Sequence, residues 1–302
     1  MIDTYIINLK EEINNFHIVK NKLKQKNFKK IFRFNAIYGK KIKNFKPYDK
    51  YLTSYFKYFG PFGAMGSALS HYKLLHNIYN KTLKYNKSSL LDKYVLILED
   101  DVSPNYNYKR LENIVHNIPN DADVLILHSF EHFIKYKKTY KEEYILKNNL
   151  LLASPCCSYL VKIRSIPKFL SQKLYTYYDA QHFNFVFNNN KNVYIYKDQF
   201  FDTDYTISHN VKDNFLYRLY SKLINYFELP DYLFWTLFKT FRIPFLNYEL
   251  NTIEINFIGF ILISIIIIKY RKYIASLPTS KLIINKINEF PQAHHLIHKL
   301  SI

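Results

Sequence analysis

The chain has 302 residues, of which 48% are hydrophobic and 18% aromatic, so it can bury a core for one large domain or two and is not disordered throughout. Its net charge of +19 points to an anionic partner such as nucleic acid, a phosphorylated ligand or an acidic membrane surface. The basic excess is nearly all lysine in a chain rich in Asn, Ile, Tyr and Phe, which A/T-rich codons also explain.

Short apolar runs alternate with segments of helical periodicity over the first 200 residues. The predicted strands span residues 5–9, 31–34, 94–98, 123–127, 158–161 and 193–196, and the clearest helical patterns lie at residues 13–23 and 62–85. The run at 94–98 is continuously apolar, as in a parallel strand that is covered on both faces. This alternation favours an α/β fold with a mainly parallel sheet flanked by helices.

The composition changes near residue 212, which predicts a catalytic domain over residues 1–212 and a basic, aromatic and helical extension over 213–302. Within the extension, residues 255–268 are uncharged and apolar. As a helix they would reach roughly 21 Å, against a hydrocarbon thickness of about 30 Å. A buried core segment, an interfacial segment whose basic flank attracts anionic lipid, and a spanning helix all stay open.

The two cysteines, Cys156 and Cys157, are adjacent, so they form no disulfide framework and no metal knuckle, and a reducing compartment is the simpler interpretation. Met1 to Asp3 lead straight into the first strand without a basic region or a cleavage site. We therefore expect a cytoplasmic protein, with the option of peripheral binding to the cytosolic face of a membrane.

Three consecutive acids, Glu99, Asp100 and Asp101, follow the strongest predicted strand. Ligand sites of open α/β sheets lie beyond the carboxyl ends of the strands, which is where these acids fall. Extended geometry would put Glu99 and Asp101 on one side and Asp100 on the other. An oxygen-only ligand set suits a hard cation such as Mg²⁺ or Mn²⁺, and the alternative is a solvated acidic turn.

The start of the long helix has small residues at Gly63, Gly66, Ser67 and Ser70, three or four positions apart, followed by His71. A helix face with so little bulk lets a backbone or a flat ligand approach closely, so tight packing and ligand binding are both open. Further along, Asp179 fits either an N-cap or a site residue, and His209 fits either a metal ligand or a polar loop residue. The chain has no Walker loop, no GxGxxG and no Cys/His zinc pattern.

The order of these landmarks resembles glycosyltransferase family 25, the group of bacterial lipopolysaccharide sugar transferases and collagen galactosyltransferases. The motifs that carry the resemblance are a YxINL strand, an (F/W)xA(I/V)xG turn, a GxxGCxxSH helix start and an ILEDD strand end, found here at residues 5–9, 34–39, 63–71 and 97–101. Asp179, Gln199 and the stretch 206–209 resemble the later part of the family pattern. The resemblance covers roughly residues 3–210.

Two positions depart from that family pattern. Ser67 stands where the family usually has cysteine, a near-isosteric change. The family usually carries arginines just after the opening strand, where this chain has Glu11, Glu12, Asn14 and Asn15. If those arginines contact a nucleotide diphosphate, Lys10 or a residue elsewhere must replace them.

The resemblance implies a GT-A-type, Rossmann-like fold that transfers a sugar from a nucleotide sugar, often UDP-galactose or UDP-glucose, with inversion at the anomeric carbon. It implies a glycan, lipid-linked glycan or protein hydroxyl as the acceptor. We expect Asp179 or Asp100 as the general base, and Mn²⁺ or Mg²⁺ held by Asp101 and Glu99, with His209 able to complete the shell. The expected donor-binding residues are Asn8, Lys10, Gly63, Gly66, Ser70 and His71.

Two other functions remain open at this point. A metal-dependent phosphohydrolase would share the acidic cluster and the cation. A nucleic-acid-binding module would use the lysines and interleaved aromatics, but it leaves three acids at a strand end unexplained, because they repel phosphate. We therefore do not expect nucleic acid as the partner.

Overall fold

The computed structural model describes residues 1–60, 62–84, 88–128, 139–140, 144–146, 157–171, 173, 192–203, 240–243, 248–251 and 269. The chain divides into two compact units, Met1–Asn251 and Thr252–Ile302. The domain boundary expected near residue 212 and the apolar run 255–268 both lie outside the described residues.

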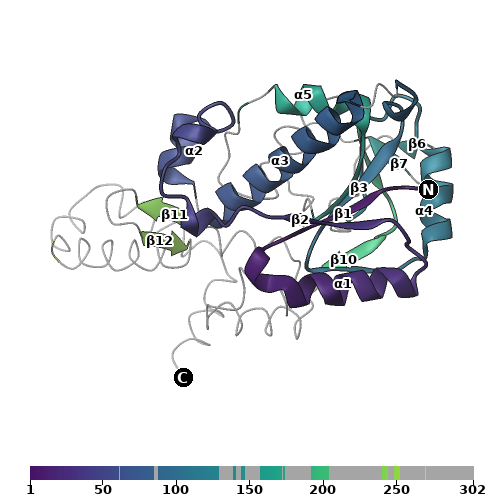
Figure 1. Cartoon of the computed structure of the whole chain (residues 1–302), viewed down its shortest axis with the longest axis horizontal. Helices are drawn as coiled ribbons and strands as arrows, with labels where there is room; N and C mark the ends of the chain where they lie inside the picture. Colours follow the sequence, from purple (N-terminus) through teal and green to yellow (C-terminus); the bar gives the residue numbers. More distant parts are fainter. Residues whose placement is uncertain are drawn as a thin grey trace, which may run out of the picture. The chain divides into compact units, whose positions relative to one another are not determined.

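An eight-stranded sheet, in the order β2-β1-β3-β8-β5-β9-β7-β6, is the centre of the first unit (Figure 1). Neighbours β1 and β2, β1 and β3, and β5 and β9 are parallel. Strand β8 runs antiparallel to both β3 and β5, and β7 runs antiparallel to β9. The strands are β1 (Thr4–Asn8), β2 (Ile31–Asn35), β3 (Tyr94–Glu99), β5 (Val124–Ile126), β6 (Thr139–Tyr140), β7 (Tyr144–Leu146), β8 (Ser158–Lys162) and β9 (Val193–Tyr196).

The predicted α/β class and mainly parallel sheet are confirmed, and the fold is consistent with a Rossmann-like arrangement. The helices are α1 (Ile13–Gln25), α2 (Ser54–Phe59), α3 (Phe62–Lys84), α4 (Tyr108–Asn117) and α5 (Ile166–Leu170). Short 3₁₀ turns occupy Lys10–Glu12, Gly39–Lys41, Lys46–Tyr48, Ser88–Leu90 and Ile163–Ser165. Two helices begin with a side-chain cap, since Thr53 accepts from the Phe56 N–H at 3.2 Å and Asn107 from the Arg110 N–H at 3.0 Å.

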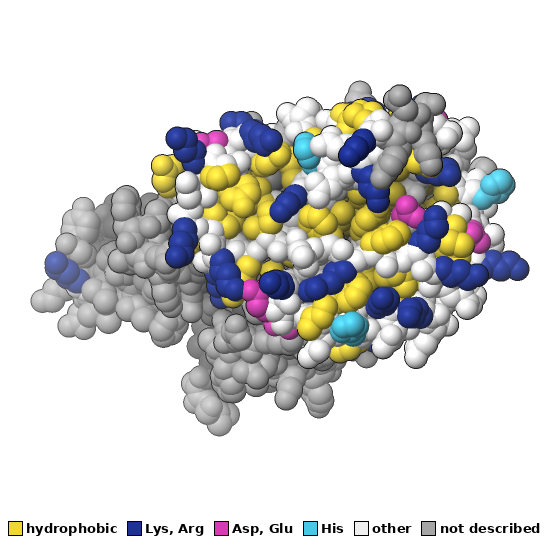
Figure 2. All heavy atoms as spheres, viewed as in Figure 1, with side chains coloured by type: hydrophobic (Ala, Val, Ile, Leu, Met, Phe, Trp, Pro, Cys, Tyr) yellow, Lys and Arg dark blue, Asp and Glu magenta, His cyan; other side chains and the backbone are white. Residues whose placement is uncertain are grey.

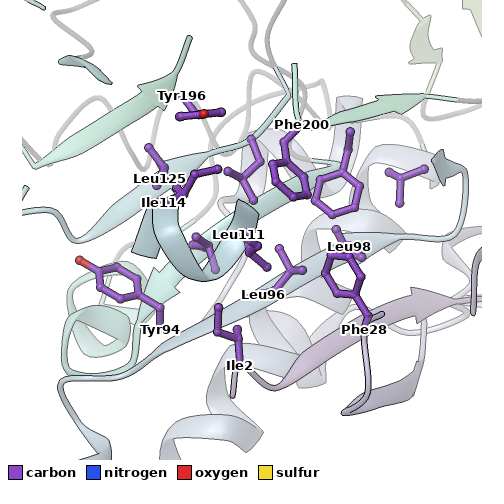
Figure 3. Close-up of a cluster of buried hydrophobic side chains, with 14 of the residues drawn as sticks. Ile2, Phe28, Tyr94, Leu96, Leu98, Leu111, Ile114, Leu125, Tyr196 and Phe200 are labelled. Atoms are coloured by element: carbon purple, nitrogen blue, oxygen red, sulfur yellow. The ribbon is translucent and has the colours of Figure 1, made fainter. Parts of the chain in front are cut away.

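The sheet is buried on both faces by different helices, with α3 and α5 on one side and α1 on the other (Figure 1). Side chains alternate along β3: Val95 and Ile97 pack on the α3 side, and Leu96 and Leu98 on the α1 side. Figure 3 shows the hydrophobic cluster on the α1 side of the sheet, in which Leu111 of α4 lies near Leu96 and Leu98. This double burial explains why β3 is apolar without interruption.

Two short antiparallel pairs lie outside the main sheet. Strand β4 (Val102–Pro104) pairs with β10 (Phe201–Thr203), and β11 (Thr240–Ile243) pairs with β12 (Tyr248–Asn251). The helical character predicted for the segment after residue 213 is therefore wrong at β11 and β12. The β-branched and aromatic residues of β11 favour a strand, and Pro244 directly after it cannot continue a helix.

Candidate functional site

The candidate site is at the edge of the sheet where β1 and β3 end. Asn8 is the last residue of β1, and Glu99 is the last residue of β3. The two strands are parallel neighbours in register Ile7↔Glu99, so their carboxyl ends meet at the same edge. The chain then turns at Asp100 and Asp101 before β4 begins at Val102.

Glu99 lies on the α3 side of this edge and accepts hydrogen bonds from two residues of that helix. Its Oε1 lies 3.2 Å from Nε2 of His71 and 3.3 Å from Oγ of Ser67. His71 is buried, and its Nδ1 lies 3.0 Å from the hydroxyl of Tyr159 on β8. Because a carboxylate can only accept, a neutral His71 carries its proton on Nε2 and accepts from Tyr159. This chain of hydrogen bonds fixes the carboxylate of Glu99, whose side chain is 28% exposed.

Asp100 lies on the opposite side, with Asn8. The amide Nδ2 of Asn8 donates to Oδ2 of Asp100 at 2.5 Å and to the carbonyl oxygen of Glu12 at 2.8 Å, while its Oδ1 accepts from Nε of Arg33 at 2.7 Å. Burial raises the pKa of Asp100 to about 6; the hydrogen bond from Asn8 opposes this shift and the charge of Glu99 adds to it. As expected from strand alternation, Glu99 and Asp100 therefore point to different sides of the sheet.

Asp101 follows Asp100 beyond the end of β3. It is buried, with 9% of its surface exposed, in the turn between β3 and β4. Its charge reaches Cys157 at the start of β8: burial raises the pKa of the Cys157 thiol well above its ordinary value, and Glu99 and Asp101 raise it further. Cys157 is a free, buried cysteine, whereas Cys156 lies outside the described residues.

The small-residue face of α3 packs against the turn that follows β2. A Cβ atom on Gly66 would lie 2.6 Å from the carbonyl oxygen of Ile37 and 2.7 Å from the nitrogen of Gly39. Ser70 is fully buried; its Oγ accepts from the Ile37 N–H at 2.7 Å and donates to the Gly66 carbonyl at 2.6 Å. These contacts are those of tight packing, one of the two alternatives for this face, and two of the sequence landmarks thereby hold each other in place.

The structure brings together some predicted site residues and leaves others apart. Asn8, His71, Glu99, Asp100 and Asp101 come from β1, α3 and the end of β3 and converge on one edge. The remaining predicted residues comprise Lys10, which is exposed in the turn before α1, Gly63, which lies in the first turn of α3, and Asp179 and His209, which are outside the described residues. The donor-binding roles of Lys10 and Gly63, the catalytic role of Asp179 and the metal-binding role of His209 stay predictions.

Two residues of the site carry no sequence signal that would have identified them. Tyr159 is one apolar-looking residue of a buried strand, and Arg33 is one of many basic residues in the chain. Their contacts join residues 88 and 25 positions apart, so only the folded chain reveals them. Gln199 belongs to the later part of the family pattern. Its Nε2 lies 3.3 Å from Nδ1 of the buried His128.

An open hollow of about 620 Å³ lies elsewhere, at the C-terminal end of α1, where Lys26, Asn105 and Arg110 are among its lining residues. It includes none of the predicted site residues. Within the described parts of the chain, no group of three or more His, Cys, Asp or Glu residues is arranged to hold a metal ion. None of the described helices combines the length and the apolar character of a membrane-spanning segment.

Comparison with known proteins adds the family. A model of glycosyltransferase family 25, described as an LPS biosynthesis protein family, matches residues 1–226. No curated protein matches the chain. The matched range contains β1, β3, α3 and the acidic strand end, that is, every part of the site described above. The chain therefore belongs to glycosyltransferase family 25.

Proposed function

We propose that this glycosyltransferase moves a hexose, galactose or glucose, from a UDP-sugar to a hydroxyl group of a glycan, a lipid-linked glycan or a protein, with inversion and with a divalent metal ion. We further propose that its fold is of the GT-A type. Family membership implies the transferase activity and links it to LPS biosynthesis. The observation that carries the rest is the run Glu99 to Asp101 at the carboxyl end of β3, beside Asn8, where open α/β sheets bind ligands.

The oxygen donors at this edge fit Mn²⁺ or Mg²⁺ in their chemistry. We propose that Asp101 and Glu99 hold the ion. Because the described residues include no group of three or more metal ligands, we propose that His209 or phosphate oxygens of the donor complete the coordination shell. A bound divalent ion would offset the negative charge that grows on the departing nucleoside diphosphate. The hydrogen bonds from His71 and Ser67 would hold Glu99 in a fixed orientation for this task.

Inversion by a single displacement needs a base for the proton of the acceptor hydroxyl. Asp100 is a candidate, because its pKa of about 6 leaves it ionised at neutral pH and still basic enough to take a proton. The amide of Asn8 holds this carboxylate from one side. Asp179 is the second candidate, in which case Asp100 would hold hydroxyl groups of the ribose or of the acceptor.

We also propose that the protein is cytoplasmic and binds peripherally to an anionic membrane surface, with residues 213–302 contributing. The net charge of +19 supports this. Figure 2 shows Lys and Arg side chains scattered over the visible face among hydrophobic ones, with few acids. Such a scattered distribution favours attraction to an extended anionic surface over the continuous basic groove of a nucleic-acid-binding protein.

A donor screen by ligand-induced thermal stabilisation tests the proposed function. We expect one UDP-sugar to raise the melting temperature, and to do so only when Mn²⁺ or Mg²⁺ is present. Turnover assays separate the alternatives. Release of inorganic phosphate from a phosphate ester, without release of UDP from a sugar donor, would identify a phosphohydrolase. Salt-dependent binding to single-stranded nucleic acid without any nucleotide-sugar binding would identify a nucleic-acid-binding module.

A further inference from the structure

Arg33 on β2 is held at the candidate site by three acceptors. Its Nε donates to Oδ1 of Asn8 at 2.7 Å, and its Nη2 donates to the carbonyl oxygens of Leu9 and Lys10 at 3.1 and 3.4 Å. The centre of the guanidinium group lies 5.7 Å from the ring centroid of Phe16 on α1. The group is thus fixed in position and orientation before any ligand arrives, which lowers the entropic cost of binding.

Part of this guanidinium group remains available. Nε and Nη2 are used by the acceptors above, whereas Nη1 has no hydrogen-bond partner among the described residues. The Arg33 side chain is half-buried, so it is reached by solvent and by a ligand. A planar guanidinium with two N–H groups to spare matches the oxygens of a phosphate group.

Carboxylates lie on the β3 side of Arg33, and Lys20 shares the Phe16 ring with it. Asn8 joins Arg33 directly to Asp100, and Glu99 comes one residue before it. In the turn after β1, Glu11 is paired with Lys41, which reduces its repulsion of an anion. A diphosphate that enters this edge meets the proposed metal ion on the β3 side together with the charge of Asp100, so a fixed cation on the β1 side, where Arg33 is held, would bind its remaining oxygens.

We propose that Arg33 binds the diphosphate of the donor through Nη1. The inference rests on the proposed function, since it assigns one part of the donor to one side chain. It places the diphosphate between the Arg33 guanidinium, which is held beside the end of β1, and the acids at the end of β3. Uracil and ribose would then lie elsewhere, and their contacts would not depend on Arg33.

The test compares UDP with uridine by isothermal titration in the presence of Mn²⁺, for the whole chain and two variants. Arg33→Gln should weaken UDP binding roughly tenfold to a hundredfold, the loss of a charge-assisted contact, and leave uridine binding unchanged. Arg33→Lys, which keeps the charge without the planar fork, should fall in between. Lys29→Gln is the matched control: the residue is exposed, it precedes the same strand, and its loss removes the same charge without affecting UDP.

Each contrary result has a distinct meaning. Equal UDP binding by wild type and Arg33→Gln would overturn the inference, and sugar transfer by the wild type would show that the proposed function still stands. An equal loss of UDP and uridine binding would also overturn it, because Arg33 would then act only by shaping the site through Asn8. A wild-type chain that neither binds UDP nor transfers sugar from any UDP-sugar would overturn the proposed function and the inference together.

Discussion

The side-chain amide of Asn8 donates to the carboxylate of Asp100 across 92 positions of sequence, with 2.5 Å between Nδ2 and Oδ2. The same amide accepts from Arg33 and donates to the Glu12 carbonyl, so both of its N–H groups are used within the protein. Asn8 is buried, with 1% of its surface exposed. It therefore joins the ends of β1 and β3 through its side-chain hydrogen bonds.

Replacement of Asn8 should disturb catalysis more than folding. We expect Asn8→Ala to lower kcat/KM about 10- to 100-fold, because Asp100 and Arg33 both lose the group that orients them. Steady-state kinetics with the preferred UDP-sugar provides the measurement. Asn35→Ala is the control, since Asn35 is the exposed register partner of Asn8 at the end of β2. If Asn8→Ala and Asn35→Ala were equally active, the hydrogen bonds of Asn8 would have no role in the reaction.

The hydrogen bonds from Tyr159 to His71 and from His71 to Glu99 should affect metal binding at the proposed site. Tyr159→Phe removes one hydroxyl and leaves the packed ring, so Glu99 loses only its indirect support. We expect Mn²⁺ affinity or activity to fall about 10- to 100-fold, as is typical when such a supporting group is lost. Tyr72→Phe is matched to it, since the Tyr72 hydroxyl donates to the Phe169 carbonyl and not to a site residue. Mn²⁺ titration that fails to separate the two variants would argue against this role.

The contact between α3 and the turn after β2 leaves no room for a side chain at Gly66. A methyl group there would lie 2.6 Å from the Ile37 carbonyl oxygen, so Gly66→Ala must push two backbones apart. We expect the free energy of unfolding to fall by about 1–3 kcal/mol. Asn77→Ala, at an exposed position of the same helix, should change it little. Urea denaturation of the two variants measures the difference, and an unchanged stability of Gly66→Ala would refute the packing role.

Asp123 before β5 should make stability depend on pH. Burial raises its pKa, but hydrogen bonds from Lys168, Ser165 and Asn192 outweigh burial and hold the pKa below its ordinary value. A carboxylate with a lowered pKa contributes its full stability above the unfolded-state pKa, about 3.9. That contribution is lost as the pH falls through the lower pKa of the folded state.

We therefore expect Asp123→Asn to lower the free energy of unfolding by about 2 kcal/mol at pH 7, and the difference from wild type to narrow below about pH 4. Asp121→Asn, two residues away and exposed, is the control and should show a smaller effect. Urea unfolding at a series of pH values measures both. A difference that stays constant down to pH 2 would mean that the charge of Asp123 contributes nothing.

Much of the sheet was predictable because buried strands are short apolar runs. The predicted strand 193–196 coincides with β9, and the prediction 94–98 lies within β3. The direction of β8 was not predictable, because an apolar run such as Ser158–Lys162 reads alike in a parallel and an antiparallel strand. Strands β11 and β12 lie in a segment that was predicted as helical. Its aromatic and basic composition has no clear period of two that would have revealed them.

Only the part of the site that is formed by residues close together in the sequence was predictable. The acids after β3 stand out because they end the strongest apolar run, and their place beyond a strand end indicates a ligand-binding edge. The alternation of Glu99 and Asp100 followed from strand geometry, whereas the burial of Asp101 in the turn after β3 did not. Arg33 and Tyr159 reach the site through tertiary contacts, which no motif or residue spacing in the sequence predicts.

The most direct test is transfer of a labelled sugar from the proposed UDP-sugar donor by an Asp101→Asn variant. We predict that this variant folds like the wild type, as judged by circular dichroism and melting temperature, but transfers no sugar at any Mn²⁺ concentration, because the proposed metal ligand has lost its charge. Asp92→Asn, which removes an exposed carboxylate paired with Arg164, should transfer at the wild-type rate. Undiminished transfer by Asp101→Asn would contradict the proposed role of the acidic strand end.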